Sequence, residues 1–214
     1  TIKYIDDGIS EHNIRLRELN NNVLAKPRPY TNSTSRIDCL FLQLACLVEK
    51  PKKIMEIGTW IGTSAYALSQ ASDALIYTCD QGPDNFYIFE GPYTDRIIRH
   101  PDTHSSEFFK KIDGGFDFVF VDGWLEDDDV KGIFEKCEDN FTFITHDYYR
   151  PEESELVFCK GHHAVERMIK YAWENGYETE SYTPSPDWYS AGGYHVKKFG
   201  GINLCCAMVK FEKA

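Results

Sequence analysis

The most informative stretch of this chain is Ile54-Met55-Glu56-Ile57-Gly58-Thr59-Trp60-Ile61-Gly62-Thr63-Ser64. It has the pattern of a buried strand that ends near an acidic residue, a turn with two glycines, and the start of a helix. In open α/β sheets, ligands bind at the carboxyl ends of the strands, and glycine lets the backbone approach a ligand without a Cβ atom in between. The free amides at the start of the helix can bind an anion, such as an amino-acid carboxylate. The stretch therefore predicts a ligand site at this turn.

The spacing of the two glycines separates classes of nucleotide-binding protein. A dinucleotide site has Gly-x-Gly-x-x-Gly, and a phosphate-binding loop ends in Gly-Lys-Ser or Gly-Lys-Thr. Residues 56–62 follow neither pattern, because they read Glu-x-Gly-x-x-x-Gly. The spacing disfavours a nicotinamide-dependent dehydrogenase, which stays a rival that binding of reduced nicotinamide would support.

Strand and helix patterns alternate after this turn. Short, nearly continuous apolar runs predict strands, and apolar residues at helical spacing predict helices. The expected strands are 53–57, 74–79, 95–100, 116–121, 141–145, 177–182 and 203–211. The expected helices are 36–49, 64–72, 105–112, 127–137 and 161–174. This order predicts an α/β fold with a Rossmann-like, seven-stranded, mostly parallel sheet and helices on both faces.

The last strand is expected to run antiparallel to its neighbours. About twenty residues, rich in Gly, Pro and aromatics, join the last two expected strands without a helical pattern. Parallel strands need a crossover connection, which is usually a helix. A second expectation concerns the amino-terminal end: residues 1–33 form a helical leader and residues 34–214 form the ligand-binding domain.

Charge and composition limit the partners. The formal net charge of −11 disfavours a nucleic-acid partner, because proteins that grip a phosphate backbone need clustered Lys and Arg. No apolar run approaches the roughly 18 residues of a membrane span. The seven cysteines form no Cys-x-x-Cys pair, which predicts reduced, buried thiols. We therefore expect a cytoplasmic protein without a membrane partner that acts on a small molecule or a saccharide, and a homodimer is compatible with the sequence.

Further acidic residues follow three of the expected strands. Asp80 follows the second strand, Asp122-Gly123 follows the fourth, and His146-Asp147 follows the fifth. Because the carboxyl ends of parallel strands lie at one rim of a sheet, these side chains should face the ligand bound at the glycine turn.

The four blocks, 54–64, 75–80, 116–123 and 141–147, resemble in their order the class I S-adenosylmethionine-dependent methyltransferases. The similarity is to the O-methyltransferase branch, whose members methylate catechols, sugars and antibiotics, and it runs from about Thr34 to the carboxyl terminus. The resemblance implies an S-adenosylmethionine-dependent methyltransferase that performs O-methylation of a small molecule or a saccharide.

The resemblance also implies roles for individual residues. Asp80 would hold the ribose hydroxyls, and His104 and Ser105 would lie near the adenine. The implied cofactor-binding set is Glu56, Gly58, Thr59, Trp60, Gly62, Ser64, Asp80, His104, Ser105 and Asp122. Asp122 and Asp147 match the acidic positions that bind a magnesium ion in metal-dependent members. The residues expected nearest to the reaction are Asp122, His146 and Asp147.

One position departs from the family pattern. Relatives often carry a histidine two residues after Asp-Gly, whereas here Leu125 follows Asp122-Gly123-Trp124. Leucine can be neither a base nor a metal ligand. This departure favours an alternative function, that of a catalytically inactive S-adenosylmethionine-binding partner or sensor, and hydroxylation chemistry on the same scaffold stays open as well.

Overall fold

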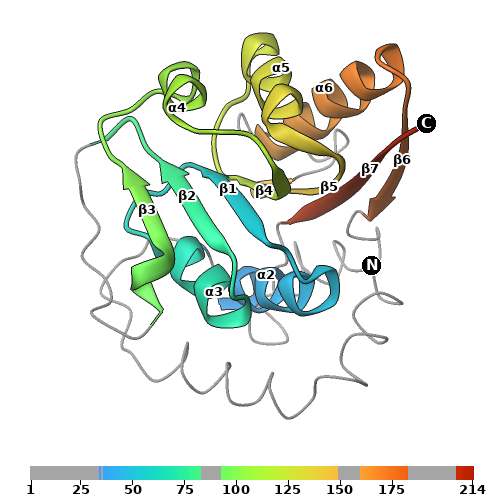
Figure 1. Cartoon of the computed structure of the whole chain (residues 1–214). Coiled ribbons are helices and arrows are strands. Elements are labelled where there is room, and N and C mark those ends of the chain that lie inside the picture. The colour runs from blue at the N-terminus through green and yellow to red at the C-terminus, as the bar shows by residue number, and fades with distance from the viewer. Residues whose placement is uncertain (1–33, 35, 83–92, 149–159, 183–205) are drawn as a thin grey trace, which may run out of the picture.

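The computed structural model describes residues 34, 36–82, 93–148, 160–182 and 206–214 (Figure 1). The strands are β1 (Lys53–Ile57), β2 (Leu75–Cys79), β3 (Ile97–His100), β4 (Phe116–Val121), β5 (Cys137–Thr145), β6 (Tyr177–Tyr182) and β7 (Ala207–Lys213). The helices are α2 (Arg36–Glu49), α3 (Thr63–Ala71), α4 (Ser105–Lys111), α5 (Asp127–Lys136) and α6 (Lys160–Glu174), with a 3₁₀ turn η1 (Thr94–Arg96). The leader expected in residues 1–33 lies outside the described residues.

The seven strands form one sheet in the order β3-β2-β1-β4-β5-β7-β6. Strands β1 to β5 pair in parallel, and β7 runs antiparallel to both β5 and β6. The predicted fold class is therefore confirmed, including the antiparallel last strand. Chain order reverses at β1, which has β2 on one side and β4 on the other, so the ends of these strands form the crevice where open α/β sheets bind ligands.

Helices cover both faces of the sheet, as Figure 1 shows, with α2 and α3 on one face and α4, α5 and α6 on the other. Alternate residues of β1 enter different cores: Ile54 packs with residues of α2 and α3, whereas Met55 and Ile57 pack with residues of α4, α5 and α6. This two-sided burial explains why the strand is a nearly continuous apolar run. No helix in the described parts of the chain has the length and apolar character of a membrane span.

Two strands differ from their predicted limits. β5 begins at Cys137, four residues before the apolar run that starts at Phe141. Cys137 pairs with Phe116 of β4, and the exposed, polar Asn140 pairs with Glu212 of β7. β7 is described from Ala207 to Lys213, so it continues two residues beyond the predicted end at Phe211. The added residues of β5 and β7 are strands because they pair with neighbouring strands. Their own sequence has no apolar pattern that predicts a strand.

Burial of the cysteine thiols agrees with the sequence analysis. Among the described residues, Cys39, Cys46, Cys79 and Cys206 are buried, and Cys137 is partly buried. Burial raises the pKa of the Cys46 and Cys79 thiols, which keeps them protonated and unreactive.

Candidate functional site

The glycine turn connects three adjacent strand ends through backbone contacts. The amides of Gly58 and Thr59 donate to the carbonyl oxygen of Cys79, at 2.9 and 3.1 Å, and the amide of Asp122 donates to Ile57 O at 2.9 Å. Gly58 has φ +99°, and a Cβ atom there would lie 2.5 Å from the carbonyl oxygen of Asp122. Only glycine fits this position, because both the backbone conformation and the neighbouring strand exclude a side chain.

Glu56 lies behind the turn, on the side of α3. Its side chain is fully buried, and its two oxygens accept hydrogen bonds from Ser64 Oγ, at 2.6 Å, and from Thr78 Oγ1. Thr59 Oγ1 in turn contacts Thr78 Oγ1. Burial raises the pKa of Glu56 to about 7, although the two hydroxyl groups oppose this shift. Glu56, Ser64 and Thr59 therefore hold the turn to the sheet and to α3, and they are largely or fully buried.

Asp80 connects the loops that follow β1 and β2. Its Oδ2 accepts from the backbone amide of Trp60 at 2.7 Å, and its Oδ1 accepts from the amide of Gly82 at 2.7 Å. Trp60 adopts φ +46° and its side chain is half exposed. A carboxylate has about four lone-pair positions, so two remain for other donors. The arrangement suits a ligand with adjacent hydroxyl groups.

The segment before α4 lies next to Asp80, because the Thr103 amide donates to the Asp80 carbonyl oxygen at 2.8 Å. His104 is exposed and caps α4 through a contact with the Ser106 amide. Ser105 is buried and donates to Asp129 Oδ1 at 2.5 Å. The structure therefore places His104 at the rim of the crevice, whereas the hydroxyl group of Ser105 is already used to join α4 to α5.

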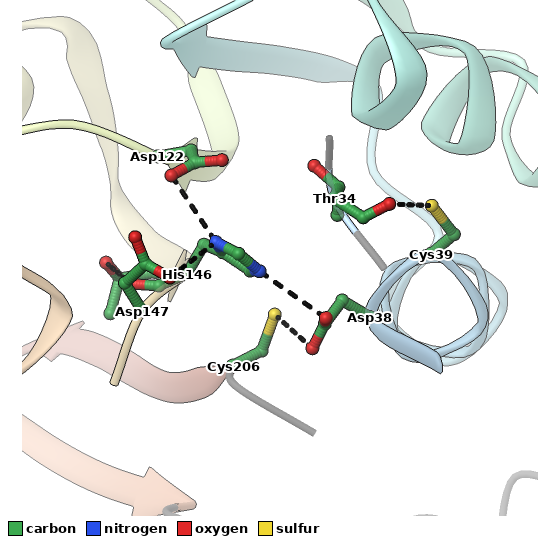
Figure 2. A network of polar contacts seen from close by, with 8 residues as sticks. Thr34, Asp38, Cys39, Asp122, His146, Asp147 and Cys206 are labelled. Atoms are coloured by element: carbon green, nitrogen blue, oxygen red, sulfur yellow. Dashed lines mark hydrogen bonds and ion pairs between the residues drawn. The ribbon is translucent and has the colours of Figure 1, made fainter. Parts of the chain in front are cut away.

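The ends of β4 and β5 bring together Asp122, His146 and Asp147 (Figure 2). His146 Nδ1 lies 3.4 Å from Asp122 Oδ1 and 3.2 Å from Asp147 Oδ1. The His146 amide donates to Val121 O at 2.9 Å, which fixes this segment beside β4. The sequence predicted the meeting of these three residues, and the structure brings them within contact distance.

The opposite side of the imidazole faces Asp38 of α2. Asp38 Oδ2 lies 3.4 Å from His146 Nε2, and Asp38 is fully buried. Burial by itself lowers the pKa of His146, but the carboxylates of Asp122, Asp147 and Asp38 outweigh it and raise that pKa well above its ordinary value. The three carboxylates therefore favour a positive charge on His146 or close to it.

The cluster has the properties of a cation site. One ligand atom from each of Asp122, His146 and Asp147 lies within 4.8 Å of the others. Nδ1 of His146 is buried and makes no hydrogen bond of acceptable geometry, although two carboxylates lie next to it. Two carboxylate oxygens and one imidazole nitrogen suit Mg²⁺ or a softer divalent metal such as Mn²⁺. The prediction named only Asp122 and Asp147 as metal ligands, and the geometry adds His146 between them.

The backbone around Asp147 depends on a close contact with α6. Asp147 adopts φ +54°, which is unusual for a residue other than glycine. The Gly161 amide donates to Asp147 O at 3.2 Å, and a Cβ atom on Gly161 would collide with the carbonyl oxygen of His146. The first turn of α6 therefore supports the segment that carries the cluster.

A cavity of about 480 Å³ lies at the other edge of the sheet, near the amino ends of β1 and β4. Its lining includes Asp117, Glu178, Glu180 and Glu212, and its Lys210 forms an ion pair with Glu49. The carboxyl ends of β1, β2, β4 and β5, where the predicted site residues lie, do not line this cavity. We therefore assign the site to the crevice and leave this cavity without a function.

Asp38 was not among the site residues predicted from the sequence. In α2, Asp38 lies on the same side as Leu42 and Ala45, which are one and two turns further along and are fully buried. A carboxylate on an otherwise apolar, buried helix face could have indicated a functional or structural role for Asp38, because a buried carboxylate needs a hydrogen-bond partner. The identity of that partner depends on the packing of α2 beside the end of β5.

Comparisons with known proteins point to a methyltransferase domain in this part of the chain. Residues 55–148 match the family model described as a methyltransferase domain, and this range contains the glycine turn, Asp80, Asp122 and His146-Asp147. No curated protein matches the chain significantly in sequence.

Solved structures share the fold at low sequence identity. A methyltransferase of Podospora anserina, PaMTH1, bound to S-adenosylhomocysteine, has 18% identity and a TM-score of 0.62, and the match covers 93% of this chain and 87% of that one. The O-methyltransferase TomG of Streptomyces achromogenes, in complex with S-adenosylmethionine and involved in tomaymycin synthesis, has 14% identity, a TM-score of 0.61, and coverage of 93% and 89%. An O-methyltransferase of Bacillus cereus, in complex with S-adenosylhomocysteine, has 15% identity, a TM-score of 0.58, and coverage of 92% and 90%.

Replacing Glu56 tests the buried carboxyl group. The pKa of Glu56 is about 7 in the folded protein and about 4.5 in the unfolded chain. Its contribution to stability is therefore fully present below about pH 4.5 and is lost as the pH rises through 7. Glu56→Gln cannot ionise, so it should remove up to ~1.4 kcal/mol per pH unit from the pH dependence of the free energy of unfolding over this range. Urea unfolding at several pH values measures it, and an unchanged slope would show that Glu56 is ionised in the fold. Glu135→Gln, at an exposed position on α5, is the control.

Replacing Gly58 tests the close contact between β1 and β4. Gly58→Ala should lower the free energy of unfolding by at least about 1–3 kcal/mol, because the new Cβ atom meets the Asp122 carbonyl and the backbone keeps a positive φ. Gly123→Ala is the matched control, since a Cβ atom there would contact nothing within 4 Å, and its effect should stay within about 0.5 kcal/mol. Urea unfolding measures the free energy of unfolding of both variants. A similar decrease in the two variants would contradict the role of Gly58.

Proposed function

We propose that this chain is a class I S-adenosylmethionine-dependent methyltransferase, which methylates a hydroxyl oxygen of a small molecule or a saccharide at the carboxyl edge of its sheet. The observation that carries the proposal is the convergence of the Gly58 turn, Asp80 and the cluster of Asp122, His146 and Asp147 on adjacent strand ends. The domain extends from residue 34 to 214 in this proposal.

The turn and Asp80 form the cofactor half of the proposed site. The bare backbone at Gly58, Trp60 and Gly62 would lie against the methionine and ribose portions, and Asp80 would accept from the ribose hydroxyls. Glu56, Thr59 and Ser64 act by holding the turn, since their side chains are buried and bonded to the sheet and α3. Asp122 would lie between the cofactor and the acceptor. His104, with Ser105 next to it in the chain, would lie near the adenine.

The cluster forms the acceptor half. The acceptor oxygen would form a bond to the methyl carbon as the carbon–sulfur bond breaks, and the hydroxyl proton would pass to the Asp147 carboxylate, with His146 holding that carboxylate in place. Alignment of two reactants contributes roughly 7–11 kcal/mol, and a positioned base typically contributes about 10²–10⁴ in rate. A divalent cation, with magnesium as the first candidate, would be held by Asp122, His146 and Asp147 and would lower the pKa of the acceptor hydroxyl.

Leu125 favours the second candidate, a protein that binds S-adenosylmethionine without turnover. Its side chain is buried in the core, so the position contributes no polar group to the crevice. His146, however, already lies between Asp122 and Asp147, which supports an enzyme that needs no histidine at position 125. A cytoplasmic location also belongs to the proposal, and the free, buried thiols of Cys46 and Cys79 support it.

The cofactor half is tested by calorimetric titration with S-adenosylmethionine and S-adenosylhomocysteine. Asp80→Asn should weaken both by about 10- to 100-fold, because hydrogen bonds to a charged group contribute roughly 1.5–3 kcal/mol. Asp73→Ala, before the other end of β2 and almost fully exposed, is the control and should bind like the wild type. Binding of neither ligand by the wild type would refute the proposed function, and binding without turnover on any acceptor would favour the second candidate.

The acceptor half is tested by methyl transfer to a panel of catechols, other phenols and saccharides, with and without Mg²⁺ or a chelator. Asp122→Ala, His146→Ala and Asp147→Ala should each lower kcat by about 10²-fold or more. Affinity for S-adenosylmethionine should change little in His146→Ala and Asp147→Ala. Asp127→Ala, an exposed position in the first turn of α5, should retain activity. Unchanged turnover in all three site variants would remove these residues from the reaction.

A further inference from the structure

A fully buried carboxylate lies behind His146, on the side away from Asp122 and Asp147 (Figure 2). Asp38 belongs to α2, which precedes β1 in the chain. Asp38 Oδ2 lies 3.4 Å from His146 Nε2, and Asp38 Oδ1 accepts from Cys206 Sγ at 3.5 Å. Three segments distant in sequence, namely α2, the end of β5 and the residue before β7, therefore meet at one carboxyl group.

The chemistry of the carboxylate decides which nitrogen carries a proton. An ionised carboxyl group only accepts hydrogen bonds, so the contact with Asp38 requires a proton on His146 Nε2. In a neutral imidazole, the lone pair then lies on Nδ1, which is the atom directed at Asp122 and Asp147. Whether or not Nδ1 also carries a proton, the contact with Asp38 holds Nε2 and leaves Nδ1 on the side of Asp122 and Asp147.

We propose that Asp38 is a positioning residue, which fixes the ring orientation of His146 so that Nδ1 faces the site shared with Asp122 and Asp147. The importance of that site rests on the proposed function, whereas the orientation of the ring does not. Burial supports the proposal, because a carboxylate inside an apolar layer is costly unless hydrogen-bond partners compensate it. Leu42 and Ala45 show that the same stripe of α2 otherwise buries apolar side chains.

Without Asp38, the imidazole can rotate about the Cβ–Cγ bond and turn Nδ1 away from Asp122. Replacing the group that orients a metal-binding or catalytic histidine typically costs about 10- to 100-fold in metal affinity or activity. Asparagine can still accept from Nε2–H through its amide oxygen, so Asp38→Asn should retain part of the orientation. Asp38→Ala removes the acceptor altogether and should lose it.

The first experiment observes the ring directly in the full chain without added metal. In ¹⁵N-histidine-labelled protein, Nε2–H of His146 should give a proton signal that exchanges slowly with water, because its acceptor is buried. The signal, assigned with the His146→Gln variant, should disappear in Asp38→Ala and persist with faster exchange in Asp38→Asn. A slowly exchanging signal in Asp38→Ala equal to that of the wild type would overturn the proposal.

The second experiment measures Mn²⁺ binding by electron paramagnetic resonance and kcat with an acceptor found in the panel. Asp38→Ala should weaken Mn²⁺ affinity and lower kcat by about 10- to 100-fold, with Asp38→Asn intermediate and affinity for S-adenosylmethionine unchanged. Gln43→Ala is the matched control, since Gln43 is a fully buried polar residue of the same helix that donates to Gln70, away from the cluster. Equal losses in Asp38→Ala and Gln43→Ala would reduce Asp38 to a packing role and overturn the proposal.

The two experiments separate failure of the positioning role from failure of the proposed function. If no acceptor is methylated and no Mn²⁺ binds, the proposed function fails, but the Nε2–H signal still decides whether Asp38 orients the ring. If methylation occurs and Asp38→Ala retains both the signal and the wild-type kcat, the positioning role is wrong and the proposed function stands.

Discussion

The contact between the backbone of Gly58 and that of Asp122 is the constraint on which the site depends. The amide of Asp122 bonds to Ile57 O, and a side chain at Gly58 would occupy the place of the Asp122 carbonyl. This contact keeps the ends of β1 and β4 in register, so the glycine turn and the cluster of Asp122, His146 and Asp147 lie at one edge of the sheet. The backbone remains bare where a ligand must approach closely.

The negative charge around His146 is the second constraint, because burial makes an uncompensated carboxylate costly. Three carboxylates surround His146, and the deepest of them, Asp38, lies in the apolar layer between α2 and the sheet. Such an arrangement is stable only when positive charge or hydrogen-bond donors compensate the carboxylates. The imidazole meets this need from the centre, and its ring is held on both sides. A cation or an ionising acceptor then encounters a site whose geometry is already set.

Several parts of the fold and site followed from local patterns. The strand 53–57 and the helix 36–49 were predicted at their observed limits, because buried strands and apolar helices carry strong periodic signals. Asp80, Asp122 and Asp147 were predicted at one edge, because parallel strands end together. The first residues of β5 and the position of Asp38 were not predicted, since exposed strand residues and a buried acid depend on partners far along the chain. The observed bonding of Ser105 to Asp129 likewise depends on how α4 packs against α5.

By itself, the sequence determined the order of strands and helices, the glycine turn and the acidic residues at the strand ends. These features are local: each rests on periodicity or on the conformation of a few consecutive residues. Only the tertiary structure decided that Glu56 is buried behind the turn, that His146 stands between Asp122 and Asp147, and that Asp38 of α2 supports it. Side-chain orientation and burial arise from packing between segments up to 168 positions apart, as the contact of Cys206 with Asp38 illustrates. No local pattern contains that information.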